Sequence, residues 1–196
     1  MKKILALLFC LIPLGVSAQN FLDDFQANNL GWNVYYGDNY MSTIQNGLMH
    51  LETKEGAKDA MVTCYSSLDT NKPFELEIKL MKTKINDEQR GIGIVFNYKD
   101  DLNFDVFYLM KGSVLYRKIV DSKIVGQRRA SVDLNEKLKD HELLVKYYPG
   151  NLHFFVNGVD AIEINYATLE YSGIGIAVWA EDGKQSADVD YIKYRQ

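Results

Sequence analysis

The segment NLHFFVNGVDAIEI, residues 151–164, contains the strongest local signal for β-structure in this chain. Apolar side chains occupy alternate positions on both sides of the pair Asn157-Gly158: Leu152, Phe154 and Val156 before it, and Ile162 and Ile164 after it. Alternation with period two is typical of a strand with one buried face. Asn-Gly between two such runs predicts a tight β-hairpin, because both central residues of a type I′ turn need positive φ.

The same period continues along most of the sequence. In PFELEIKL, residues 73–80, four apolar side chains share one face and the charged side chains share the other. Further strands are predicted near residues 21–26, 41–52, 60–66, 91–98, 103–110, 113–120, 141–148, 173–179 and 187–194. Many short strands at a spacing of about 8–12 residues predict an all-β, antiparallel sandwich or barrel.

The N-terminus, MKKILALLFCLIPLGVSAQN, has the features of an export signal. Lys2 and Lys3 precede an apolar run, and Val16-Ser17-Ala18 forms a small-residue cleavage site. We therefore expect a signal peptide over 1–18, a single β-sandwich domain over 19–196, and a periplasmic or secreted location. No later stretch approaches the roughly 20 apolar residues that a spanning helix needs.

Charge and cysteine content narrow the classes of partner. Without Lys2 and Lys3, 20 basic side chains remain against 26 acidic ones, a net charge of −6. No basic stripe is present, so we expect neither nucleic acid nor an anionic membrane surface as a partner. Cys64 is the one cysteine beyond the signal peptide, which precludes an internal disulfide and predicts a buried, inert thiol. The three isolated histidines do not predict a zinc site.

Two segments place glycine at every second position: GIGIVF at 91–96 and GIGIAVW at 173–179. They lack the third glycine and the following helix of a dinucleotide-binding loop. In a strand, the glycines share one face with Trp179. Gly93 and Gly175 then form a floor that a sugar ring can approach, with Trp179 as its wall, or they relieve crowding in a curved sheet. The sequence is compatible with both interpretations.

The neighbouring strands supply polar candidates for the same ligand. Continued alternation through NFDVFYLM, residues 103–110, predicts Asp105 and Phe107 on the outward face, and SVLYRK adds Arg117. Charged groups hydrogen-bond sugar hydroxyls, and an aromatic face covers C–H groups. The candidate ligand-binding set is therefore Gly93, Asp105, Phe107, Arg117, Gly175 and Trp179.

The order of several short motifs resembles bacterial concanavalin A-like lectin/glucanase domains, nearest to laminin-G-like jelly rolls and to uncharacterised domains related to sugar hydrolases. The resemblance spans the mature chain and rests on DDF and GW at 23–25 and 31–32, QNGLMHLE, FELEIKL, GIGIVFNYKDDLNFDVFYL, HELLVKYYPGNLHFFVNGVDAIEI, GIGIAV and ADVDYIKY. It implies a two-sheet jelly-roll sandwich with curved antiparallel sheets, whose concave face commonly carries carbohydrate.

The sequence contains no motif that requires an enzymatic function. A glycosidase needs two carboxyl groups about 5–9.5 Å apart. Glu75 and Glu77 are the least unlikely pair, because residues i and i+2 of a strand are about 6.6 Å apart. The related glucanases carry further acids on that strand face, and here Lys79 follows. A solvated charged face explains the pattern equally well, so we assign no catalytic residue.

The resemblance also implies a structural calcium where the first and last strands meet. Asp24 and Asp190 are the acids at matching places, but two carboxylates are too few for a calcium site by themselves. We therefore expect no cofactor, with structural calcium as the remaining option.

The sequence is compatible with three functions. The first is a non-catalytic, lectin-like carbohydrate-binding module. The second is a glycoside hydrolase of the concanavalin A-like group. The third is a protein-interaction or envelope-structural domain that binds a cell-envelope polypeptide, as laminin-G-like domains can.

Overall fold

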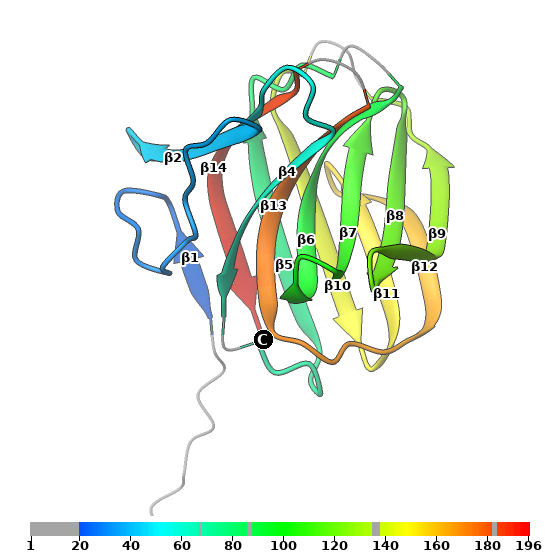
Figure 1. The fold of residues 1–196 in the computed structure, drawn as a ribbon. Coiled ribbons are helices and arrows are strands. Elements are labelled where there is room, and N and C mark those ends of the chain that lie inside the picture. Colours follow the sequence, from blue (N-terminus) through cyan, green and yellow to red (C-terminus); the bar gives the residue numbers. More distant parts are fainter. Residues whose placement is uncertain (1–19, 67, 86–87, 135–137, 182–183) are drawn as a thin grey trace, which may run out of the picture.

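The computed structural model describes residues 20–66, 68–85, 88–134, 138–181 and 184–196. These residues form two antiparallel β-sheets stacked face to face, with no helix among them (Figure 1). The predicted signal peptide, residues 1–18, lies outside the described residues.

The first sheet has eight strands and contains the start and the end of the described chain. Its order is β12 (Val159–Ala167), β11 (Gly150–Val156), β10 (His141–Tyr148), β5 (Phe74–Met81), β14 (Ser186–Arg195), β3 (Leu48–Thr53) and β2 (Tyr40–Gln45). The short β1 (Phe21–Asp23) also pairs with β14. The first and last strands are therefore hydrogen-bonded to each other.

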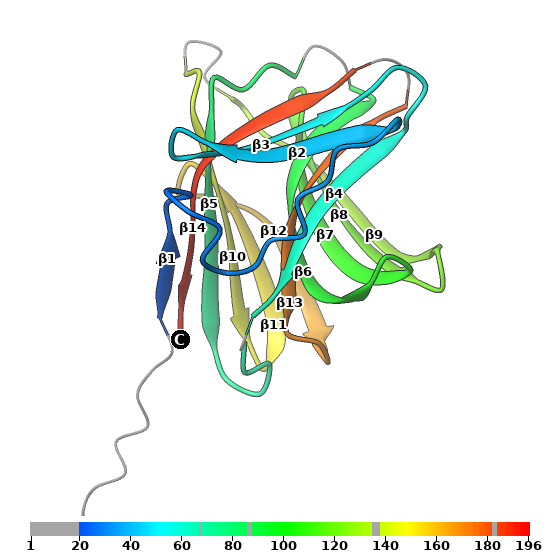
Figure 2. The ribbon, with the colours of Figure 1, turned by 60° about the vertical axis from the view of Figure 1, so that its left-hand side comes forward.

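The second sheet has six strands. Its order is β4 (Asp59–Tyr65), β13 (Gly173–Ala180), β6 (Arg90–Asp100), β7 (Asn103–Met110), β8 (Ser113–Val120) and β9 (Lys123–Ser131). Figure 2 shows the two sheets stacked, with the strands of the second sheet curved along their length. We call the surface of this sheet that faces away from the first sheet the concave face.

Turn chemistry sets the local connections. In the predicted hairpin between β11 and β12, Asn157 and Gly158 have φ of 50° and 78°, which confirms the Asn-Gly prediction. A second such pair, Asn46 (φ 53°) and Gly47 (φ 71°), divides the predicted strand 41–52 into β2 and β3. Strand β9 was not predicted, because this edge strand is largely exposed and its sequence KIVGQRRAS does not alternate.

The main core lies between the sheets, as the alternation predicts. The apolar face of β5 is buried, and it packs with the apolar faces of β10, β11 and β14 against those of β4, β6 and β13. Cys64 lies in this core at 1% exposure and is free. Burial, reinforced by the charge of Asp23, raises the pKa of the Cys64 thiol to about 12. The prediction of a buried, unpaired thiol is confirmed.

The DDF and GW motifs anchor the N-terminal segment to this core. The buried Asp23 carboxylate accepts hydrogen bonds from the Trp32 indole nitrogen at 2.9 Å and from the Phe25 amide at 3.0 Å. Phe25 adopts φ 55° and packs against the Trp32 ring, with 5.8 Å between the ring centroids. These motifs therefore have a structural role on the opposite sheet from the concave face.

Candidate functional site: the concave face

The concave face carries a second apolar layer of its own. Seven buried residues form it: Val95, Tyr98, Val106, Tyr108, Met110, Leu115 and Ala177. Met61, Phe104, Ile119 and Trp179 pack against them and are partly exposed. An outward sheet face is ordinarily polar. Aromatic and aliphatic side chains on both faces of one sheet mark this surface as a candidate binding surface.

The glycines of β6 make room for the aromatic side chains of the flanking strands. A Cβ atom on Gly93 would lie 2.4 Å from the Phe107 carbonyl oxygen and 2.9 Å from Cδ1 of Tyr108. Tyr108 leans over β6 from β7, and Trp179 approaches it from β13, with 6.2 Å between the ring centroids. The two rings meet because the β6 positions between them carry no side chains.

Gly175 on β13 is enclosed in the same way. A Cβ atom there would lie 2.7 Å from the Val62 carbonyl oxygen and 2.9 Å from Cγ2 of Thr63. Both Gly93 and Gly175 are buried beneath neighbouring protein atoms. The geometry therefore agrees with the interpretation in which glycine relieves crowding, and the surface open to a ligand is formed by the covering side chains.

The structure brings two of the predicted site residues into contact. The guanidinium carbon of Arg117, on β8, lies 4.4 Å from the Trp179 ring centroid. A guanidinium over an indole ring is a favourable cation–π geometry. The Arg117 Nε atom also donates a hydrogen bond to Gln127 Oε1 at 3.2 Å. Trp179 and Arg117 are thus held together on the concave face.

The predicted orientation of Asp105 and Phe107 is wrong. Phe107 is fully buried between the sheets, where its ring centroid lies 4.7 Å from that of Phe154. Strand β7 pairs with β6 so that Tyr108 lies opposite Gly93 and Phe107 opposite Ile94. Tyr108, expected in the interior, therefore lies on the concave face. Because both faces of β7 are apolar, its alternation does not reveal which face points outward.

Asp105 also faces the interior, at 1% exposure. Its Oδ2 accepts a hydrogen bond from Asn97 Nδ2 at 3.3 Å, and its Oδ1 has no hydrogen-bond partner among the described residues. Burial raises the Asp105 pKa to about 6, against the opposing effects of the Lys118 charge, Asn97 and the Tyr116 hydroxyl. Asp105 is therefore a buried polar group and not a concave-face ligand.

Asn97, which donates a hydrogen bond to Asp105, lies at an irregularity of strand β6. Asn97 has φ 50°, and its side-chain oxygen accepts hydrogen bonds from the amides of Glu170 and Tyr171, both at 2.8 Å. The register of β6 on β7 shifts between Phe96 and Asp100. This irregularity moves Tyr98 into the concave-face layer, although strict alternation predicts it in the interior.

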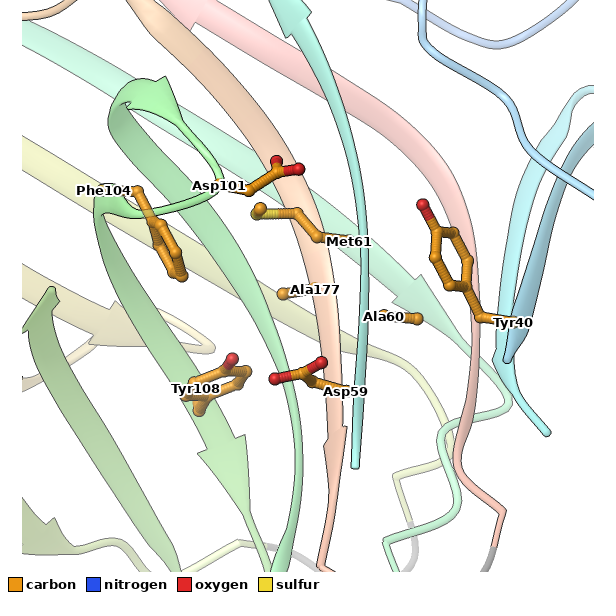
Figure 3. Close-up of a pocket in the computed structure, with 8 residues that line it drawn as sticks. All are labelled: Tyr40, Asp59, Ala60, Met61, Asp101, Phe104, Tyr108 and Ala177. Carbon is orange, nitrogen blue, oxygen red and sulfur yellow. The ribbon is translucent and has the colours of Figure 1, made fainter. Parts of the chain in front are cut away.

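A cleft opens on the concave face beside β4. It has a volume of about 200 Å³ and is lined by Tyr40, Asp59, Ala60, Met61, Asp101, Phe104, Tyr108 and Ala177 (Figure 3). Tyr40 comes from β2 of the other sheet, and Asp101 from the turn between β6 and β7. The cleft therefore combines segments that are distant in the sequence.

Polar groups project into this cleft from several sides. Figure 3 shows the carboxylate of Asp59 turned toward Tyr108. Burial, followed by the Asp59 charge, raises the pKa of Tyr108 above its usual range. Asp101 Oδ1 accepts a hydrogen bond from the Tyr98 hydroxyl at 2.9 Å. Sequence reasoning missed these residues, because a hydroxyl or carboxylate next to a turn has no local signature of binding.

The carboxylate pair considered for catalysis lies on the opposite side of the molecule. Glu75 and Glu77 project from the outer face of the eight-stranded sheet. Glu75 forms ion pairs with Lys146 at 2.7 Å and Arg195 at 3.0 Å. Glu77 accepts a hydrogen bond from the Tyr191 hydroxyl at 2.7 Å and lies 3.4 Å from Arg195. Both act as partners in a surface charge network.

The two calcium candidates each engage another group. Asp24 Oδ1 accepts the Gln26 amide at 3.3 Å, and Asp190 Oδ2 lies 3.8 Å from Lys79 Nζ. Within the described ranges, no group of three or more acidic, histidine or cysteine side chains is placed to hold a metal ion. Asp24 and Asp190 are therefore not part of such a group. Among the described residues, no helix is long and apolar enough to cross a membrane.

Comparison with known proteins identifies the fold. No family model matches the sequence, and no curated protein matches it. Among solved structures, a β-glucanase of Bacillus licheniformis superposes with a TM-score of 0.66 at 12% identity, over 92% of this chain and 99% of that chain. A carbohydrate binding module from Bacillus subtilis gives 0.56 at 15% identity, over 85% and 96%.

The exoplasmic/lumenal domain of VIP36, in a form bound to Ca²⁺ and Man3GlcNAc, gives a TM-score of 0.60 at 14% identity, over 90% of this chain and 87% of that chain. The likeness extends over nearly the whole described chain. The protein therefore has the two-sheet jelly-roll fold of concanavalin A-like lectins and glucanases, as the sequence motifs imply.

Proposed function

We propose that the domain over 19–196 is an exported carbohydrate-binding module that takes its ligand on the concave face. The observation that carries the proposal is the second apolar layer of that face, with a cleft bordered by the carboxylates of Asp59 and Asp101. Binding sites commonly combine an apolar lining with a few polar groups that fix orientation.

The chemistry of the face suits a polyhydroxylated ring. A sugar presents C–H groups on its faces and hydroxyl groups around its edge. Trp179 and Phe104 offer partly exposed aromatic surface to the former. Asp59, Asp101 and Arg117 offer charged hydrogen-bonding groups to the latter, and such bonds are stronger than those between neutral groups.

The carboxylates of the concave face lie at the cleft and not along its central strands. On β7, β8 and β13, all within the described residues, the concave-face positions hold glycine, apolar and aromatic residues, Ser113 and Arg117, and the carboxylates of Asp59 and Asp101 lie at the cleft beside β4. A glycosidase mechanism needs two carboxyl groups across the scissile bond. Because glucanases and binding modules share this fold, the fold itself does not choose between them.

Export is proposed from the N-terminal sequence. Cleavage after Ala18 would release a domain that begins at Gln19, in the periplasm or outside the cell. Intact mass measurement of the protein recovered from the producing cells tests this. A mass that still includes residues 1–18 would contradict cleavage.

A glycan array run in parallel with hydrolysis assays tests the function. We expect binding to at least one glycan class without released products. Products would select the glycoside hydrolase. Silence in both assays would reject the proposal in favour of a domain that binds a cell-envelope polypeptide.

Substitution of Trp179 tests the face itself. Trp179→Ala is expected to weaken glycan binding about tenfold, because stacking on an aromatic ring contributes on the order of 1–3 kcal/mol. Tyr148→Ala is the matched control, since this half-exposed ring lies on the outer face of the eight-stranded sheet. Circular dichroism of both variants verifies that the fold is intact. Equal binding by the two variants would place the ligand elsewhere.

A further inference from the structure

The end of the concave face formed by β8 and β9 carries two guanidinium groups. Arg117 of β8 pairs with Gln127 of β9, and Arg129 of β9 pairs with Leu115 of β8. Leu115 belongs to the concave-face layer, and Arg117 contacts Trp179, so both arginines project from the concave face. Such diagonal positions are about 7–8 Å apart.

Both guanidinium groups are held by neutral acceptors. Arg117 Nε donates to Gln127 Oε1 at 3.2 Å, and Arg129 Nε donates to Ser113 Oγ at 3.0 Å. Neither forms an ion pair with a carboxylate in the part of the chain that the structure describes. Their terminal nitrogens are therefore oriented but not neutralised.

Three cations on the outer face of the eight-stranded sheet lie close to carboxylates. On the outer face of the eight-stranded sheet, Lys146 and Arg195 are paired with Glu75, and Lys79 lies 3.8 Å from Asp190. The mature chain has a net charge of −6, so acidic side chains are plentiful. On the concave face, Arg117 and Arg129 are instead oriented by neutral groups and have no carboxylate partner among the described residues.

The concave face carries both acidic and basic side chains, and they come from different strands. The pKa of Tyr108 is raised by the Asp59 charge and lowered by the Arg117 charge, after the larger effect of burial. Tyr108 is thus near both groups, and Asp59 does not form an ion pair with Arg117. Carboxylates border the cleft beside β4, while the guanidinium groups come from β8 and β9, and that of Arg117 reaches the Trp179 ring on β13.

We infer that the ligand is an acidic saccharide, whose carboxylate or sulfate group binds at Arg117 and Arg129 while a ring of the chain packs beside the Arg117–Trp179 pair. This inference rests on the proposed function and names its ligand class. The planar guanidinium fork matches carboxylate and sulfate oxygens with two parallel hydrogen bonds. The stacking of Arg117 on Trp179 and the Ser113 bond of Arg129 hold these forks in place before the ligand arrives.

Titration calorimetry with matched polymers tests the inference. The probes are polygalacturonate, its fully methyl-esterified form, dextran sulfate, unmodified dextran and poly-glutamate. We expect polygalacturonate or dextran sulfate to bind at least tenfold more tightly than its neutral counterpart, with an affinity that falls as salt rises. The preferred polymer of the two shows whether the anion is a carboxylate or a sulfate.

Two variants of the same strand localise the contact. Arg129→Gln is expected to weaken binding of the acidic polymer about tenfold, because a charge-assisted bond is lost. Arg128→Gln is the matched control, with the same charge change at the adjacent position opposite Tyr116, whose ring packs in the core between the sheets. Its affinity is expected to stay within twofold of the wild type.

Each contrary outcome has a distinct meaning. Equal affinity for the acidic and neutral forms of a polymer would overturn the inference while leaving the proposed function in place. Poly-glutamate binding as tight as the best acidic saccharide would overturn it in favour of an acidic polypeptide. Equal losses in Arg129→Gln and Arg128→Gln would reduce it to non-specific charge attraction. Failure of every saccharide to bind, here and on the glycan array, would reject the proposed function itself.

Discussion

Replacing Asp105 by asparagine is expected to make the protein more stable at neutral pH. Asp105 is almost completely buried, and its Oδ1 has no hydrogen-bond partner among the described residues. An ionised carboxylate in such a place has lost its hydration without full compensation. Asparagine keeps an oxygen that can accept the hydrogen bond from Asn97 Nδ2, and it removes the charge.

The size of the effect follows from proton linkage. The Asp105 pKa is raised from 3.8 to about 6, so the native state binds the proton more tightly than the unfolded chain does. The associated stability is fully present below pH 3.8 and is lost as the pH rises through about 6. Since one pKa unit corresponds to 1.36 kcal/mol, the loss is about 3 kcal/mol.

Urea unfolding of the wild type and Asp105→Asn between pH 3.5 and pH 8 measures this quantity. The variant minus wild-type difference in unfolding free energy is expected to increase by roughly 3 kcal/mol from about pH 4 to about pH 6, and then to level off. The exposed Asp133→Asn is the control and is expected to give a nearly flat difference. A flat profile for Asp105→Asn, or one that falls with pH, would refute the reasoning.

Three further outcomes are expected. Gly93→Ala should lower the unfolding free energy by about 1–3 kcal/mol, because its Cβ would lie 2.4 Å from a carbonyl oxygen. Gly91→Ala, whose nearest atoms lie at 3.2 Å, should lower it less in the same urea titration. The reverse order would contradict the packing argument. Cys64 should resist a thiol reagent in the native protein and react after unfolding, and labelling at the rate of a free peptide would disprove its burial. Trp32→Phe should lower the unfolding free energy by about 1–3 kcal/mol, because it removes the indole N–H that donates a hydrogen bond to the buried Asp23 Oδ2. An unchanged urea midpoint would show that this hydrogen bond contributes little to stability.

Most strands, and the buried face of those strands that are apolar on one side, could be predicted from the sequence. Where one face is apolar and the other charged, as in residues 73–80, the period fixes which side chains are buried, because only one face can be removed from water. The Asn157-Gly158 pair determined a hairpin, since its backbone conformation is local. The burial of Cys64 followed from the same strand pattern. The motif order also indicated the fold that the solved structures share.

The side chains of the concave face follow from the pairing of distant strands, which the sequence patterns do not predict. Strand β7 is apolar on both sides, so its register against Gly93 of β6, and not its alternation, placed Tyr108 outward and Phe107 inward. The irregularity at Asn97 reversed the face of Tyr98. The cleft joins Tyr40, Asp59 and Asp101 from separate elements. Pairing between distant strands sets these relations, and period-two patterns carry no information about it because they describe one strand at a time.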